Sequence, residues 1–174
     1  MILWINGAFG AGKTTAAFEL NRRIPGSFVY DPENVGDFIR KNSPQTSILQ
    51  QGDFQDIPLW RQMNAEMLKL LASSHDGLII VPMTLVNREY YDEIITAIID
   101  SGIPVKHYIL YASKATLINR LDKRGERGES WSRQQIDRCI DAFDTVITDR
   151  KIMTDDKSID DVVSEIARLS NLTL

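Results

Sequence analysis

Apolar residues along the chain fall into two patterns, which are short continuous runs and longer stretches with apolar positions three or four residues apart. Continuous runs predict buried strands, and the wider spacing predicts amphipathic helices. The runs that predict strands cover residues 2–5, 27–30, 77–83, 105–111 and 151–154. Helices are predicted at residues 15–23, 32–41, 58–73, 87–100, 113–121, 132–143 and 158–169. Strands that alternate with helices predict an α/β fold, with a parallel sheet joined by right-handed crossovers.

Side chains that cap helices stand at several of the predicted helix starts. Asp31 precedes the second helix, which has Pro32 at its first position, and Asn87 precedes the fourth. Ser132 is followed three residues later by Gln135, which is the pattern of a capping box. We therefore expect Ser132 to begin the helix that runs to about residue 143.

The segment between the first strand and the first helix is a full match to the phosphate-binding pattern G-x-x-x-x-G-K-[ST]. Glycine allows the backbone to turn its N–H groups toward a nucleotide phosphate, and the helix start adds the positive end of its dipole. Lys13 is expected to bridge the β- and γ-phosphates of ATP, and the Thr14 hydroxyl to ligate Mg²⁺. A glycine-rich turn that binds nothing is the alternative, which the strand–loop–helix order disfavours. The predicted nucleotide-binding residues are Gly7, Ala8, Phe9, Gly10, Ala11, Gly12, Lys13, Thr14 and Thr15.

Composition narrows the class of protein. The 174 residues are expected to form one domain, 1–174, around a single core. The net charge of −4 disfavours a nucleic-acid binder, which would carry a basic face. Cys139 is the only cysteine, so no internal disulfide forms, and the sequence contains neither a signal-peptide pattern nor an apolar run of membrane-spanning length. These features predict a cytoplasmic location.

In a parallel sheet of this kind, ligands bind at the carboxyl ends of the strands. Asp31 directly follows the second predicted strand, so its carboxylate could accept a proton from an acceptor hydroxyl during phosphoryl transfer. The same residue could instead only cap the following helix, and one carboxylate could do both.

The charged, glycine-punctuated stretch at about 122–131 is predicted to be a mobile lid. Arg120 and Arg124 share one helix face, and Arg127 follows them on the loop. Such guanidinium groups could close over the phosphates, neutralise charge and exclude water. The alternative is a solvated, charged helix end.

Three further residues are candidates for binding the acceptor molecule. Thr84 follows the third predicted strand, Arg61 lies on the third predicted helix, and Arg138 lies on the helix after the lid. An arginine facing the pocket would suit an anionic or polyhydroxyl acceptor, and surface salt bridging is the alternative for Arg61.

Five segments together resemble the tunicamycin-resistance protein family: residues 4–14, 29–33, 53–61, 80–84 and 135–139. The resemblance covers nearly the whole chain. It implies a three-layer α/β/α P-loop fold like that of nucleoside-monophosphate and shikimate kinases, with a five-stranded parallel sheet in the order 2-3-1-4-5. It also implies ATP binding and the ATP-dependent modification of a nucleoside antibiotic.

The third predicted strand ends in Val81-Pro82-Met83-Thr84, without the Walker B acid of motor-type ATPases. A mechanical ATPase is therefore disfavoured, and Mg²⁺ is expected to be held chiefly by Thr14, phosphates and water. The resulting hypothesis is an ATP- and Mg²⁺-dependent kinase of a small-molecule acceptor, acting as a monomer or homodimer. A kinase of a nucleotide, nucleoside or cofactor precursor is one alternative, and an ATP-binding protein that sequesters the drug without chemistry is another.

Overall fold

Five parallel strands form the sheet of the computed structural model, which describes residues 1–126 and 128–174. The strand order is β2-β3-β1-β4-β5, as the resemblance implied. Each neighbouring pair is parallel, so the prediction of a parallel sheet is confirmed. The strands are β1 (Ile2–Gly7), β2 (Phe28–Val29), β3 (Ile79–Pro82), β4 (Val105–Tyr111) and β5 (Lys151–Met153).

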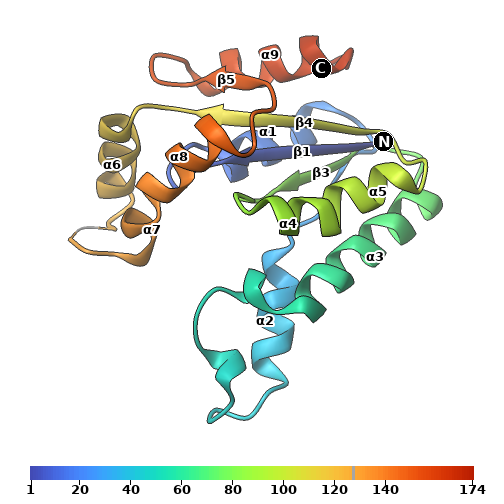
Figure 1. Cartoon of the computed structure of the whole chain (residues 1–174). Helices are drawn as coiled ribbons and strands as arrows, with labels where there is room; N and C mark the ends of the chain where they lie inside the picture. The colour runs from blue at the N-terminus through green and yellow to red at the C-terminus, as the bar shows by residue number, and fades with distance from the viewer. Residues whose placement is uncertain (127) are drawn as a thin grey trace.

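Helices cover both faces of the sheet (Figure 1). Helix α1 packs against α9 on one face, and α3 packs against η3 and α5 on the other. Helix α2 and the loop that follows it project from the lower edge of the sheet in Figure 1. The helical segments are α1 (Lys13–Arg23), α2 (Glu33–Lys41), η1 (Ile48–Gln50), η2 (Phe54–Asp56), α3 (Pro58–Ser74), α4 (Arg88–Tyr91), η3 (Asp92–Thr96), α5 (Ala97–Asp100), α6 (Lys114–Lys123), α7 (Trp131–Gln134), α8 (Ile136–Thr145) and α9 (Ile159–Ser170).

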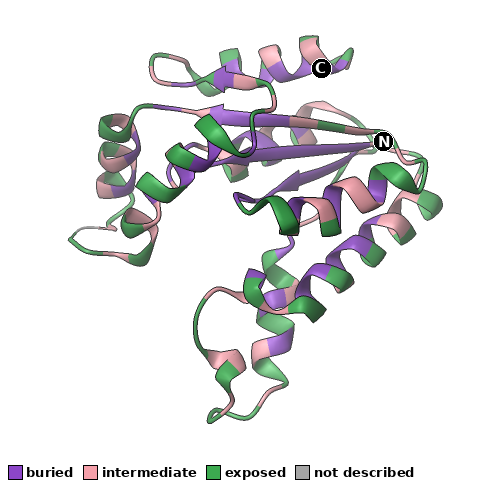
Figure 2. Ribbon diagram, viewed as in Figure 1, coloured by how far each residue is buried: buried purple, intermediate pink, exposed green. Residues whose placement is uncertain are grey.

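The core lies along the central strands, which are buried on both faces (Figure 2). All six residues of β1 and all four of β3 are buried. This double burial explains why these strands are continuous apolar runs in the sequence rather than alternating patterns. The indole of Trp4, fully buried in β1, donates a hydrogen bond to the carbonyl of Met83 at 3.1 Å.

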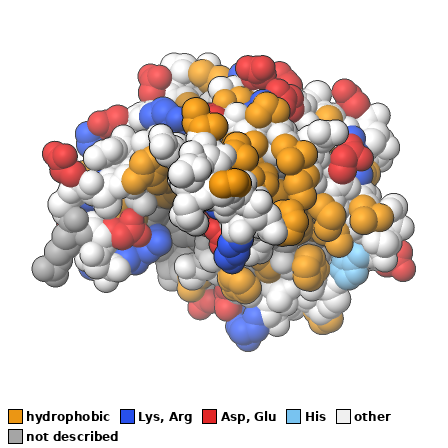
Figure 3. All heavy atoms as spheres, turned by 90° about the horizontal axis from the view of Figure 1, so that it is seen from below, with side chains coloured by type: hydrophobic (Ala, Val, Ile, Leu, Met, Phe, Trp, Pro, Cys, Tyr) orange, Lys and Arg blue, Asp and Glu red, His pale blue; other side chains and the backbone are white. Residues whose placement is uncertain are grey.

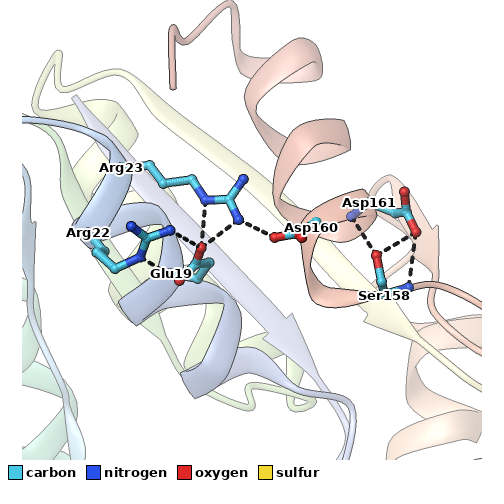
Figure 4. A network of polar contacts seen from close by, with 6 residues as sticks. All are labelled: Glu19, Arg22, Arg23, Ser158, Asp160 and Asp161. Atoms are coloured by element: carbon cyan, nitrogen blue, oxygen red, sulfur yellow. Dashed lines mark hydrogen bonds and ion pairs between the residues drawn. The ribbon is translucent and has the colours of Figure 1, made fainter.

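A polar network connects α1 with the start of α9 (Figure 4). Arg23 of α1 donates to Glu19 within its own helix and to Asp160 of α9. Ser158 and Asp161 form a reciprocal capping box at the start of α9. The network therefore adds a specific contact to the apolar packing between these two helices.

Two predicted helices differ from the observed ones. Ser130, and not Ser132, caps the helix after the charged stretch, because Ser130 has the extended backbone of a cap and accepts from the amide of Arg133. Ser132 lies within α7, so the predicted capping box is wrong, and the helix is divided at Gln135 into α7 and α8. The helix predicted at 87–100 begins at its Asn87 cap but contains the π-helical segment η3.

Figure 3 shows the molecule from below, where apolar side chains are exposed among charged ones. The apolar side chains in this view adjoin one another over part of the surface and are bordered by charged side chains. The exposed large apolar residues of α2, η1 and α3 are Phe38, Ile48, Leu59, Met67 and Leu70.

Among the described residues, no helix is both long enough and apolar enough to pass through a membrane.

Candidate functional site

The loop between β1 and α1 has a backbone that only glycine accommodates at two of its turns. Gly7 has φ +147°, and a Cβ there would lie 2.6 Å from the carbonyl oxygen of Leu110. Gly10 has φ +84°, and a Cβ there would lie 2.9 Å from the carbonyl oxygen of Leu117. The loop therefore packs directly against β4 and α6, and helix α1 begins at Lys13. Its amides and the start of α1 provide the donors that a phosphate chain requires.

Two buried polar side chains fix this loop to the segment after β3. The side-chain Oδ1 of Asn6 accepts from the backbone amides of Gly7 and Leu85, each at 2.9 Å. The Thr84 hydroxyl donates to the carbonyl of Gly7 at 2.8 Å. Because buried polar groups with all partners present are rigid, the first turn of the loop is held in one position.

Lys13 is held inside the site. Its ammonium donates to the carbonyl of Ala8 at 3.1 Å and lies 5.3 Å from the ring centroid of Phe9. Burial lowers the pKa of Lys13 to about 8, since the charged form is desolvated there. A phosphate group beside this ammonium would favour its protonated form.

Nucleotide binding is therefore expected to take up a proton at alkaline pH. At pH 8.5 a lysine with a pKa of about 8 is about three-quarters neutral, so ATP binding should take up about 0.5–0.8 proton. At pH 7 the ammonium is already formed, and the uptake due to Lys13 should be close to zero. Calorimetric titration in two buffers with different ionisation enthalpies measures this number. Equal heats in both buffers at pH 8.5 would contradict the expectation.

A cavity of about 570 Å³ opens beside the loop. Gly10, Gly12, Lys13, Thr14 and Thr15 line one side of it. We call another part of its lining the far wall, and this part consists of Glu33, Asp53, Phe54, Gln55, Thr84 and Trp131. The cavity therefore has a phosphate-binding side and a side with carboxylates, amide and aromatic rings.

A second cavity, of about 350 Å³, shares Gly10, Gly12 and Thr15 with the first. Arg120, Arg124 and Thr154 also line it, together with apolar side chains from β4 and α9. The Arg120 guanidinium donates to the Thr154 hydroxyl at 3.0 Å and to the Thr154 carbonyl. The loop thus lies between two cavities, and Arg124 lines both.

The structure brings several predicted site residues to these cavities and places others elsewhere. The Asp31 carboxylate accepts from the amide of Glu33 at 3.0 Å, so it caps α2, and its role as a base stays a prediction. Arg138 lies beside the far wall, 3.7 Å from the Asp53 carboxylate. Arg127 lies outside the described residues.

Arg61 lies away from the large cavity. Its side chain is 8% exposed, pairs with Glu93 at 2.6 Å and donates to the carbonyl of Gln55 at 2.6 Å. Gln55 itself lines the cavity. The geometry therefore gives Arg61 a role in positioning the far wall, and direct contact with an acceptor stays a prediction.

Sequence reasoning did not single out the far-wall residues Glu33 and Asp53. Burial raises the pKa of Glu33, and the neighbouring charge of Asp31 acts in the same direction. Burial also raises the pKa of Asp53, against the effect of the hydrogen bond from the Gln55 amide. Glu33 is two residues from Asp31 on the same strand-end segment, which is a signal that could have found it.

Few side chains of the site could ligate a Mg²⁺ ion. Within the two described ranges, no group of three or more His, Cys, Asp or Glu side chains could hold a metal ion. Thr14 lines the large cavity beside Lys13. A hydroxyl at this place fits an ion that is bound chiefly through phosphate oxygens and water.

Comparison with known proteins gives a consistent result. A family model described as an AAA domain matches residues 2–146. The structure of the tunicamycin resistance protein of Deinococcus radiodurans has a TM-score of 0.83 and 30% identity, over 99% of this chain and 96% of that one. A sugar kinase from a Janibacter species (TM-score 0.68, 16% identity, 99% and 95% covered) and a gluconokinase from Sinorhizobium meliloti (0.64, 16%, 97% and 93%) share the fold. No curated protein matches the chain.

Proposed function

The chain belongs to the family of the tunicamycin resistance protein, within the AAA-domain P-loop proteins, and on this premise we propose that it is an ATP-dependent small-molecule kinase. Its acceptor is proposed to be the nucleoside antibiotic tunicamycin, so that phosphorylation confers resistance. The observation that carries the proposal is the pair of cavities on either side of the phosphate-binding loop. A kinase must bring two substrates to one phosphate, and this arrangement provides a place for each.

The residues of the loop would hold ATP, which supplies the phosphoryl group. The loop amides and Lys13 would bind the phosphates, and Thr14 would ligate the accompanying Mg²⁺. Arg120 and Arg124 line the second cavity, which would take the adenosine part of ATP. Arg124 also lines the first cavity, where it could neutralise charge on the transferring group.

We assign the general base to the segment from Asp31 to Glu33. Glu33 is the first choice, because it lines the large cavity and burial raises its pKa toward the working pH. Asp31 is the second choice, since one of its oxygens already accepts from the Glu33 amide. The chosen carboxylate would take the proton of the acceptor hydroxyl as the hydroxyl oxygen attacks the γ-phosphorus of ATP. ADP would leave with the electron pair of the broken P–O bond.

The residues at the end of strand β3 favour a kinase over a mechanical ATPase. It ends at Pro82 and is followed by Met83 and Thr84, so no carboxylate stands at the usual place of the Walker B acid. Thr84 instead fixes the loop and lines the cavity. This arrangement suits a small-molecule transferase.

The test is to incubate the protein with Mg-ATP and tunicamycin and to look by mass spectrometry for a product heavier by one phosphoryl group. We expect such a product with the wild type and none with Lys13→Met. If ATP binds and no product forms, tunicamycin is not the substrate. A product with a nucleoside, nucleotide or cofactor precursor from an acceptor panel would favour the first alternative. Retained resistance in a variant that binds ATP but transfers nothing would favour sequestration.

A further inference from the structure

A chain of buried polar side chains begins at Asn6, directly before the phosphate-binding loop. The Oδ1 atom of Asn6 accepts from the backbone amides of Gly7 and Leu85, and its Nδ2 donates to the carbonyl of Leu85 at 2.8 Å. These backbone groups fix the orientation of the side-chain amide, because turning it over would place donors against donors. The second hydrogen of Nδ2 is then left for a further acceptor.

The imidazole of His107 provides this acceptor. His107 lies on β4, which is a neighbour of β1 in the sheet (Figure 1), and its side chain is 4% exposed. The Nε2 atom of His107 lies 3.1 Å from Nδ2 of Asn6. Because Asn6 can only donate at this position, Nε2 must carry no hydrogen, and the ring is neutral with its hydrogen on Nδ1.

Ionisable groups from α4 and from the segment before β5 face the imidazole. An oxygen of Asp149 lies 3.2 Å from Nδ1 of His107, although its alignment with the N–H is too poor for a full hydrogen bond. The contact with His107 lowers the pKa of Asp149, so this carboxylate is charged at neutral pH. Tyr91 packs edge-on against the imidazole at 5.4 Å, and Arg88 lies over the Tyr91 ring and pairs with Asp92. Asp149 thus stabilises the hydrogen on Nδ1, while Nε2 faces the donor of Asn6.

Protonation of His107 would place an N–H at Nε2 against the N–H of Asn6. The Asn6 amide cannot turn over to accept it, since its oxygen would then leave the amides of Gly7 and Leu85. Two buried donors that face each other are unfavourable. Asn6 would therefore move, and the first turn of the loop, which Asn6 holds, would move with it.

We propose that His107 is a positioning residue of the nucleotide site, which holds the loop through Asn6 when it is neutral and releases the loop when it is protonated. This inference rests on the proposed binding of ATP by the loop and adds a residue that acts through Asn6. Acid should therefore weaken nucleotide binding. A positive charge that acted only through its field would have the opposite effect, because it attracts anionic phosphates. The sign of the pH effect thus distinguishes positioning from simple electrostatic attraction.

The experiment combines an NMR titration of the wild type with nucleotide affinities measured between about pH 5 and 8, the range in which histidines titrate. Nitrogen-15 spectra show which ring nitrogen carries hydrogen, and we expect His107 to carry it on Nδ1 at the alkaline end. Calorimetry with Mg²⁺ and a non-hydrolysable ATP analogue gives the dissociation constants at the same pH values. Each constant is divided by that of His107→Gln at the same pH, so that the titration of the nucleotide and of Lys13 cancels.

Two substitutions separate the acceptor from the shape of the ring. His107→Gln keeps an acceptor and does not titrate, since its amide oxygen can take the place of Nε2. Its affinity at the alkaline end should stay within about threefold of the wild type, and the wild type should bind about tenfold more weakly than this variant at the acid end. His107→Phe keeps a ring that packs against Tyr91 but has no acceptor, so it should bind about tenfold more weakly throughout the range.

His75→Gln is the matched control. His75 is the other histidine of the chain and lies at the end of α3. Its removal should leave the affinity and the pH profile of the wild type unchanged.

Hydrogen on Nε2 at the alkaline end, the same pH profile for the wild type and His107→Gln, or tighter binding on protonation would each overturn the inference. Wild-type affinity in a folded His107→Phe would also overturn it, and the other two measurements decide the question without this variant. The expected pH profile without phosphoryl transfer to any acceptor would support the inference and remove the kinase proposal. No binding of the ATP analogue by the wild type at any pH would overturn both.

Discussion

Lys13→Met is expected to reduce kcat/KM of phosphoryl transfer by about a hundredfold or more, the usual effect of removing one preorganised electrostatic stabiliser. Methionine keeps the length and apolar stem of lysine but has no charge and donates no hydrogen bond. The Lys13 ammonium, which donates to the Ala8 carbonyl, is a basic group of the loop itself that can turn to a phosphate. Nucleotide affinity and turnover should therefore fall together.

The same substitution should not destabilise the fold. Burial disfavours the charged form of Lys13, so its folded-state pKa of about 8 lies below the usual 10.5. Lys13 then costs stability where it is charged, and this cost declines as pH rises from about 8 toward 10.5. Lys13→Met should show a melting temperature equal to or above that of the wild type at pH 7. If this variant bound nucleotide with wild-type affinity, the assignment of the loop as the nucleotide-binding site would be wrong.

Lys41→Met serves as the matched control. Lys41 is exposed on α2 and lies 4.0 Å from Asp37, a surface pair of the kind that contributes little. Its nucleotide affinity, turnover and melting temperature should all equal those of the wild type. A loss of activity in both variants would indicate a general effect of charge rather than a role for Lys13.

The parts of the molecule that sequence predicts are those encoded locally. The loop from Gly7 to Thr14 is contiguous, and both the strand before it and the helix after it follow from neighbouring residues. The buried strands are predictable because a strand covered on both faces must be apolar throughout. The strand order came from the family resemblance, since no local pattern specifies which strands are neighbours.

The far wall was not predictable because distant segments create it. Asp53 and Phe54 belong to a polar stretch without periodicity, and only packing against Gly36 and Trp60 turns this stretch into a cavity wall. Arg61 was a candidate for contact with the acceptor, but its side chain pairs with Glu93, which lies 32 residues away in the sequence. A single arginine in a helical pattern does not reveal whether it faces a ligand or a buried carboxylate.

Helix caps show a third limit. Ser130 and Ser132 both have the small polar side chain that caps a helix, and Ser132 has the better sequence pattern. The observed cap is Ser130, because its backbone is extended and its hydroxyl accepts from the amide of Arg133. Local patterns therefore predict that a helix begins in this stretch but not which of two serines, two residues apart, caps it.

Glu33→Gln is expected to lower kcat of transfer by about 10²- to 10⁴-fold while nucleotide affinity stays near the wild-type value. Glutamine has nearly the same shape and cannot accept the proton of an acceptor hydroxyl. Asp31→Asn should cost less than about tenfold, because an asparagine oxygen still caps α2 through the Glu33 amide. Transfer assays and nucleotide titrations on both variants test the difference. The reverse order, with Asp31→Asn inactive and Glu33→Gln active, would assign the base to Asp31.

The pH dependence provides an independent check on Glu33. Its pKa in the folded protein is raised by burial and by Asp31, so the acid limb of the wild-type activity profile should lie above pH 4.5. A carboxyl whose pKa rises on folding holds its proton more tightly in the folded state, and the stability it contributes is lost as pH rises through the folded pKa. Glu33→Gln should therefore be as stable as the wild type near pH 4 and equal or more stable at pH 7. A variant that loses both activity and stability at pH 7 would instead make Glu33 a structural residue.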